Sequence, residues 1–134
     1  MKEVSIVMPA YNEELSIGKT IKEIKQSIKN IKKYKFEIVV SNNNSTDKTE
    51  EIAKKEGARV VFEKRKGYGH AFKKGLSEVK GDIIITSDAD STYPLYNISR
   101  FIDLLEKDNY DFVIGNRLAN LEKKSMNFLN YIGN

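Results

Sequence analysis

Residues 4–31 read VSIVMPAYNEELSIGKTIKEIKQSIKNI, and the change of period inside this stretch decides the fold. Residues 4–8 are mostly apolar and rich in β-branched side chains, as in a buried strand. From Ile17 to Ile31 an isoleucine recurs at every third or fourth position, which is the spacing of one face of a helix. The stretch therefore predicts a strand followed by a helix that packs on it.

The same alternation continues along the chain. Further strands are predicted at residues 36–40, 59–62, 82–86 and 110–114, and further helices at residues 45–56, at 70–79 and from Pro94 onward. Ser45 or Thr46 is expected to cap the helix at 45–56, and Gly57 to end it. The strand at 82–86 is apolar enough to be buried on both faces. Strands that alternate with helices predict an α/β fold, a mostly parallel sheet with helices on both faces.

Length and composition exclude several classes of protein. A chain of 134 residues forms one domain with its own core, and the absence of cysteine excludes disulfides and thiolate metal sites. The net charge of +4 favours anionic ligands, but aromatic residues are not interleaved with the lysines, so no nucleic-acid partner is expected. The chain lacks a signal-peptide layout and any apolar run approaching the roughly 18 residues of a membrane span, so a cytoplasmic protein is expected.

Polar residues are concentrated directly after three of the predicted strands. They follow the first strand at residues 9–14, the second at 41–47 and the fourth at 87–94. In a doubly wound parallel sheet, ligands bind beyond the carboxyl ends of the strands, where the strand order reverses. A binding site is therefore expected at that edge.

The acidic stretch Asp88-Ala89-Asp90 is the sharpest chemical signal, because it leaves a strand of isoleucines. Two carboxylates beside a dry strand are costly unless a cation or hydrogen-bond donors compensate their charge. Mg²⁺ or Mn²⁺ held by one or two carboxylates together with substrate phosphates meets this need. The alternative is that the acids cap the next helix, although Ser91 and Thr92 could do so alone.

Other motifs are weaker. The loop at residues 65–70 is basic and glycine-containing, so Lys66 could lie against a diphosphate, or the loop could simply be a solvated turn. The triplet Gly18-Lys19-Thr20 imitates the end of a P-loop but lacks the earlier glycine, so a P-loop is excluded. His70 is the only histidine, which excludes a histidine-based metal cluster or triad.

A basic flank runs beside the isoleucine stripe of the first predicted helix. Each of its lysines follows a core isoleucine by one position, at Lys22, Lys25, Lys29 and Lys32. A solvated helix face is the simpler interpretation of this pattern. Docking on anionic lipid headgroups is the alternative.

Several of these segments occur in the order of a known family, at residues 8–14, 43–47, 65–70, 88–90, 92–94 and 115–117. With them the chain resembles the family 2 glycosyltransferases of GT-A fold, above all the branch related to dolichyl- and polyprenyl-phosphate sugar synthases. The resemblance implies a Rossmann-like GT-A sandwich, in which residues 1–134 form a single nucleotide-sugar-binding domain. It also implies that the acceptor-side segment and any membrane helices lie beyond residue 134.

The resemblance further implies a metal-dependent, inverting transfer of a sugar, such as a hexose, from a UDP- or GDP-linked donor. The implied acceptor is a polyprenyl or dolichyl phosphate at the cytosolic face of a membrane, and the implied cofactor is Mg²⁺ or Mn²⁺. Asp88 and Asp90 match the DxD motif of the family, with Ala89 between them and Asp90 as the more direct metal ligand. The other implied site residues are Pro9, Tyr11 and Glu13 around the nucleotide and Arg117 near the donor or acceptor phosphate.

The chain departs from the family pattern after the second predicted strand, where an acid is usual and Asn42 and Asn43 stand instead. Both amides are expected to lie over the nucleobase, and Asn43→Asp is expected to tighten UDP or GDP binding. A non-catalytic nucleotide-sugar-binding remnant and a transferase acting on a soluble glycan are the alternatives. A signalling receiver module is disfavoured, because Tyr11-Asn12 and Glu63-Lys64 occupy the places of its acidic pair and phosphoacceptor aspartate.

Overall fold

The computed structural model describes residues 1–92, 95–108 and 110–115. The chain divides into two compact units, Met1–Ile102 and Asp103–Asn134. The strands of the described residues all belong to the first unit, and the last helix begins in the first unit and continues into the second.

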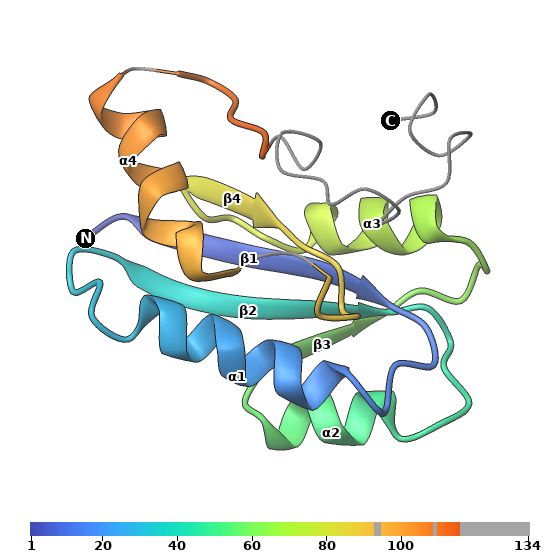
Figure 1. Cartoon of the computed structure of the whole chain (residues 1–134). Helices are drawn as coiled ribbons and strands as arrows, with labels where there is room; N and C mark the ends of the chain where they lie inside the picture. Colours follow the sequence, from blue (N-terminus) through green and yellow to red (C-terminus); the bar gives the residue numbers. More distant parts are fainter. Residues whose placement is uncertain (93–94, 109, 116–134) are drawn as a thin grey trace, which may run out of the picture. The chain divides into compact units, whose positions relative to one another are not determined.

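The first unit is built on a four-stranded sheet whose spatial order is β3-β2-β1-β4 (Figure 1). All its pairings are parallel. The strands are β1 (Glu3–Ala10), β2 (Lys35–Asn42), β3 (Arg59–Phe62) and β4 (Ile83–Thr86). The helices are α1 (Ile17–Ile28), α2 (Thr49–Lys55), α3 (Tyr68–Ser77), the short 3₁₀ helix η1 (Leu95–Asn97) and α4 (Ile98–Lys107). Figure 1 shows α1 and α2 on one face of the sheet and α3 on the other, which confirms the predicted α/β fold.

Strand β1 is the centre of the packing, because every residue from Val4 to Ala10 is buried. Its even-numbered side chains, such as Ile6 and Met8, join the main core with the fully buried isoleucines of α1. Burying side chains of this size contributes about 1.5–3 kcal/mol each. The predicted isoleucine stripe is therefore confirmed as the core face of α1.

Helix α3 covers the opposite face of β1 and approaches it closely at Gly75. A Cβ atom at this position would lie 2.6 Å from Cγ1 of Val7 and 3.3 Å from Cβ of Ser41. Both neighbours are strand residues with no exposed surface. A glycine at this point therefore sets the distance between α3 and the sheet.

Helix boundaries differ from the predicted ones: α3 is Tyr68–Ser77 instead of 70–79, and α1 and α2 differ as well. Helix α1 ends at Ile28, whose carbonyl accepts a hydrogen bond from the backbone N–H of Ile31 at 2.9 Å in the turn that follows. Helix α2 is capped by neither Ser45 nor Thr46. Instead, Oδ1 of Asp47 accepts the backbone N–H of Thr49 at 2.9 Å. Gly57 follows α2 with a φ of 82°, as expected of a glycine that ends a helix.

Two strand predictions were wrong. Strand β4 is not buried on both faces, because alternate residues along it are exposed and Ile84 is 45% exposed. Residues 110–114 form no strand, and no pairing with another strand is found for them among the described residues. Apolar composition favours a strand, but the strand forms only where a neighbour can accept its backbone hydrogen bonds. Pro94 lies outside the described residues.

The close approach at Gly75 can be tested by adding one methyl group. Overpacking against Val7 outweighs the gain in helix propensity, so we expect Gly75→Ala to lower the free energy of unfolding by about 1–2 kcal/mol. Gly69→Ala is the matched control, because that glycine is also in α3 and a Cβ there would meet nothing within 4 Å. Urea denaturation of both variants measures the difference. Equal stability of the two would show that α3 can move away from the sheet without cost.

Candidate functional site

The candidate site lies where the strand order reverses. From β1 the chain proceeds to β2 and β3 on one side, and β4 then pairs with the opposite edge of β1. Because all the strands are parallel, their carboxyl ends meet at one edge of the sheet (Figure 1). The polar segments predicted to carry the site follow β1, β2 and β4, so they share that edge.

Asp88 and Asp90 each have one carboxylate oxygen held by a hydroxyl or amide. Oδ1 of Asp88 accepts the phenol O–H of Tyr68 at 2.9 Å. Oδ1 of Asp90 accepts the backbone N–H of Thr92 at 3.0 Å and its hydroxyl at 2.7 Å. Asp90 thus also closes a local turn at Thr92, which precedes the first helical residue, Leu95. In the described part of the chain, Oδ2 of either aspartate receives no hydrogen bond.

This pair fits a divalent cation that is shared with a ligand. The residues described by the structure contain no cluster of three or more histidine, cysteine, aspartate or glutamate side chains placed to hold a metal ion. Mg²⁺ and Mn²⁺ commonly take one or two carboxylates from the protein and their other ligands from phosphates and water. The Oδ2 atoms of Asp88 and Asp90, to which no described residue donates a hydrogen bond, are ligands of the right kind for such a site.

Thr20 supports the acidic loop from α1, a role that the sequence analysis missed. Thr20 is fully buried, and its Oγ1 lies 3.0 Å from the carbonyl oxygen of Ala89 and 2.7 Å from Oγ of Ser91. Ser91 has a φ of 61°, so the chain turns directly after Asp90. The signal was present in the sequence, because Thr20 is a polar residue in helical register with the isoleucine stripe.

The loops after β1 and β2 are joined by hydrogen bonds through Asn12. Its backbone N–H donates to Oγ of Ser45 at 3.0 Å, and its Oδ1 accepts the backbone N–H of Thr46 at 2.8 Å. The backbone N–H of Glu13 donates to Oγ1 of Thr49 at 2.7 Å. The predicted nucleotide-pocket residues therefore belong to one connected edge. Among them Pro9 is buried, Tyr11 is half exposed and Glu13 is partly buried with its carboxylate accepting the hydroxyl of Ser16.

Asn42 is buried and holds its own loop. Its Nδ2 donates to Oε2 of Glu50 at 2.9 Å, and its Oδ1 accepts the backbone N–H of Ser45 at 3.0 Å. The hydrogen bond from Lys54 keeps the pKa of Glu50 below its usual value, and the hydrogen bond from Asn42 has a smaller effect in the same direction. The amide thus stands beside a carboxylate of α2 that is charged at neutral pH.

Asn43 is also buried, and it clamps the loop between β3 and α3. Its Nδ2 donates to the carbonyl oxygens of Glu63 at 3.2 Å and Arg65 at 2.6 Å, and its Oδ1 accepts the backbone N–H of Gly67 at 2.9 Å. Both N–H bonds of the amide are therefore used inside the protein. This arrangement gives Asn43 a bracing role that the sequence analysis did not predict.

The basic loop is only partly available to a ligand. The guanidinium of Arg65 makes two hydrogen bonds of 3.0 Å to the carboxylate of Glu63. Those bonds, with the backbone N–H of Arg65, lower the pKa of Glu63 to about 2. Lys66 and His70 are exposed, and Arg117 lies outside the described residues.

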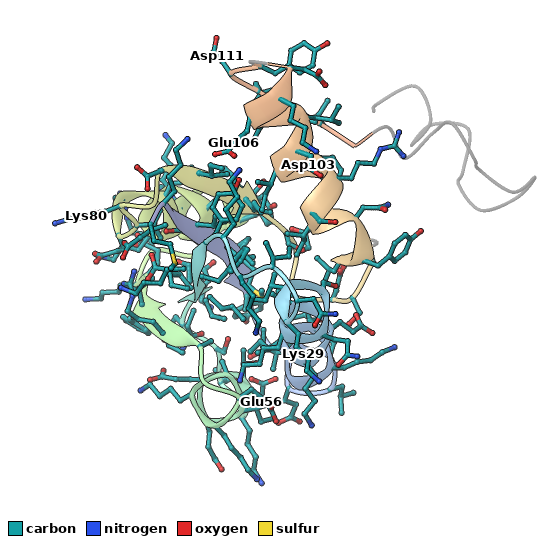
Figure 2. The ribbon with its side chains drawn as sticks, turned by 90° about the vertical axis from the view of Figure 1, so that its left-hand side faces the viewer. Lys29, Glu56, Lys80, Asp103, Glu106 and Asp111 are labelled. Atoms are coloured by element: carbon teal, nitrogen blue, oxygen red, sulfur yellow. The ribbon has the colours of Figure 1, made fainter. Side chains whose placement is uncertain are left out.

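The basic flank of α1 is partly paired as well. Nζ of Lys22 lies 3.3 Å from Oε1 of Glu56, and Nζ of Lys25 donates to the backbone carbonyl of Glu56. Figure 2 shows Glu56 at the end of α2 and Lys29 at the end of α1. Two of the four lysines therefore tie α1 to the end of α2. Among the described residues, no helix combines the length and apolar character needed to cross a membrane.

Comparison with known proteins identifies the family of this chain. The model of glycosyl transferase family 2 matches residues 5–131. The chain belongs to this family. The resemblance seen in the ordered motifs is thereby confirmed, and the chain is a family 2 glycosyltransferase.

Its relatives include lipid-phosphate sugar transferases. A dolichyl-phosphate hexose transferase of Haloferax volcanii is 36% identical over 98% of this chain and 55% of its own length. The low-salt glycan biosynthesis hexosyltransferase Agl6 of the same organism is 36% identical over 86% of this chain and 27% of its own length. An undecaprenyl-phosphate 4-deoxy-4-formamido-L-arabinose transferase of Pseudomonas savastanoi is 33% identical over 84% of this chain. The chain thus spans about half or less of the first two of these relatives.

Solved structures agree with this assignment. The glucosyl-3-phosphoglycerate synthase of Mycobacterium tuberculosis, in complex with Mn²⁺, UDP and glucosyl-3-phosphoglycerate, superposes with a TM-score of 0.64. It is 30% identical, and the match covers 78% of this chain and 39% of that one. The parallel sheet with helices on both faces is therefore the GT-A fold that the motifs implied.

The clamp formed by Asn43 reverses the expected effect of an acid at this position. In Asn43→Asp a carboxylate would replace the donor that faces the carbonyl oxygens of Glu63 and Arg65. We expect this change to lower the free energy of unfolding at neutral pH by about 2 kcal/mol and to leave UDP and GDP binding no tighter.

Asn44→Asp is the matched control for this prediction, because Asn44 is exposed and its φ of 59° is tolerated by aspartate. It should change stability by less than about 0.5 kcal/mol. Urea denaturation and nucleotide titration measure the two properties. A fully stable Asn43→Asp variant that binds UDP more tightly would restore the base-reading role of this residue.

Proposed function

We propose that this family 2 glycosyltransferase moves a sugar of the hexose class from a UDP- or GDP-linked donor to a polyprenyl or dolichyl phosphate. The transfer would depend on Mg²⁺ or Mn²⁺ and invert the configuration at the anomeric carbon. The observation that carries this proposal is the pair Asp88 and Asp90, which follows β4 at the reversal of strand order. One oxygen of each carboxylate accepts no hydrogen bond from the residues that the structure describes.

The carboxylate pair would act on the donor diphosphate. Asp90 and Asp88 would be the metal ligands, and a bound divalent cation would neutralise the charge that grows on the departing diphosphate. Lys66, exposed on a loop that Asn43 braces, would approach the same phosphates. Arg117 would approach the donor or acceptor phosphate.

The nucleoside would lie along the loops after β1 and β2. Pro9, Tyr11 and Glu13 would line its pocket, and the hydrogen bonds of Asn12 to the neighbouring loop support a preformed wall there. Asn42 would act at the edge of this pocket through its bond to Glu50. A direct contact of Asn43 with the base would be limited to its Oδ1, since both its N–H bonds are used.

A lipid phosphate would supply the attacking oxygen. That oxygen would bond to the anomeric carbon while the bond from this carbon to the donor diphosphate breaks, and the electron pair would leave with the diphosphate. A phosphate oxygen is already anionic near pH 7, so the reaction needs positioning more than a general base. The names of the dolichyl- and undecaprenyl-phosphate relatives support this acceptor class.

A soluble phosphorylated acceptor is the second candidate. The similar synthase of Mycobacterium tuberculosis has been solved with Mn²⁺, UDP and phosphoglyceric acid. In the present chain, the pairing of Lys22 and Lys25 with Glu56 leaves fewer cations for a lipid surface. An acceptor phosphate without a lipid tail would need neither lysine.

The metal role predicts cation-dependent nucleotide binding. Two carboxylates and a diphosphate repel one another without a bridging cation, so UDP or GDP should bind with Mn²⁺ or Mg²⁺ and be released by a chelator. We expect Asp90→Asn to weaken Mn²⁺-dependent binding by at least about tenfold. Asp108→Asn, at an exposed aspartate of the second unit, is the control. Calorimetry that finds equal affinity with and without chelator would remove the metal from the proposal.

The acceptor class predicts where a labelled sugar goes. With UDP- or GDP-linked hexoses and Mn²⁺, radiolabel should enter the organic phase only when a polyprenyl phosphate is supplied, and Asp90→Asn should abolish this transfer. Parallel reactions receive 3-phosphoglycerate or a soluble glycan in place of the lipid. Label in a soluble product with none in lipid would assign the acceptor to the second candidate.

A further inference from the structure

Tyr68 holds Asp88 from a different element of the fold. It is the first residue of α3, and its phenol O–H donates to Oδ1 of Asp88 at 2.9 Å. The two residues are 20 positions apart in the sequence. Within the described residues, Asp90 is held instead by Thr92 of its own turn. The orientation of the Asp88 carboxylate therefore depends on where α3 begins.

The start of α3 is itself anchored. The backbone N–H of Gly67 donates to Oδ1 of Asn43, and the carbonyl of Gly67 accepts the N–H groups of His70 at 3.1 Å and Ala71 at 3.2 Å. Gly67 has a φ of 125°, a conformation that residues with a side chain rarely adopt. The direction in which Tyr68 leaves the loop is therefore determined by the buried Asn43 clamp.

The ring of Tyr68 is restrained although much of it faces solvent. The side chain is 62% exposed, but its ring stacks on that of Phe72 with centroids 5.9 Å apart and an interplanar angle of 11°. Stacking restrains the plane of the ring, and the hydrogen bond restrains the hydroxyl. Such a tyrosine can orient a carboxylate without being part of the hydrophobic core.

We propose that Tyr68 is a positioning residue for the cation site: by holding Oδ1 of Asp88, it directs Oδ2 toward a divalent cation bound with the nucleotide. The proposal rests on the proposed function, because it requires a cation between the aspartates and a diphosphate. A carboxylate with one oxygen fixed loses less rotational freedom when the other binds a metal. Tyr68 acts on the cation only through Asp88.

Tyr68→Phe tests this role, because it removes the hydroxyl and keeps the ring that stacks on Phe72. We expect the affinity for Mn²⁺ in the presence of UDP, measured by electron paramagnetic resonance of free Mn²⁺, to fall about three- to tenfold. The midpoint of urea unfolding should stay the same, because the hydrogen bond lies at the surface. Tyr96→Phe is the matched control, since Tyr96 is a 76% exposed tyrosine of η1 and should leave Mn²⁺ affinity unchanged.

A double-variant comparison separates positioning from direct contact with the nucleotide. In an Asp88→Asn background, Tyr68→Phe should change Mn²⁺ affinity by less than about twofold, because the residue through which Tyr68 acts has lost its charge. A full effect in that background would overturn the proposal, as would unchanged Mn²⁺ affinity in Tyr68→Phe alone. If the wild-type chain with UDP bound no Mn²⁺ at all, the proposed function would fail and this inference with it.

Discussion

The burial of β1 on both faces is the constraint on which the rest of the structure depends. Its even-numbered side chains pack against α1, and Val7 on the other face lies under Gly75 of α3. A strand buried in this way must also satisfy its backbone groups on both edges, which β2 and β4 do. The pairing with β4 reverses the strand order beside β1. The pairing of β4 with β1 therefore both completes the hydrogen bonding of the central strand and determines where the candidate site lies.

The edge of the sheet is held in shape by polar side chains that bond to the backbone of neighbouring loops. Asn12 joins the loops after β1 and β2, and Asn43 holds the loop before α3. Thr20 of α1 donates a hydrogen bond to the backbone of the loop that carries Asp88 and Asp90. Loops at such an edge carry backbone groups that regular structure does not satisfy, and short polar side chains satisfy them here. The oxygens of Asp88 and Asp90 that accept no hydrogen bond from the described residues therefore lie on loops that are held in place, as a preorganised ligand site requires.

Features that depend on short-range pattern were predictable, and features that depend on neighbours were not. The isoleucine spacing placed the core face of α1, and Gly57 ended α2 as expected. The isoleucines of β4 indicated hydrophobicity but not that this strand would be at an edge of the described sheet. Residues 110–114 have the composition of a strand but pair with no strand in the described part of the chain. The same holds for the candidate site. Asp88 and Asp90 were predictable because they follow a strand directly, whereas the roles of Thr20 and Tyr68 depend on contacts with distant residues.

By itself, the sequence determined the α/β class, the edge of the sheet where polar groups gather, the acidic pair and the family. Each depends on local periodicity or on the order of motifs, and both can be read from the sequence alone. Only the tertiary structure decided that Asn43 braces a loop, that Lys22 and Lys25 hold Glu56, and that Tyr68 reaches Asp88. Thr20 and Ala89, 69 positions apart, meet because β4 pairs beside β1 and brings the acidic loop over the start of α1. A hydrogen bond requires its two atoms to lie about 3 Å apart, and the separation of two residues in the sequence does not tell whether they reach that distance.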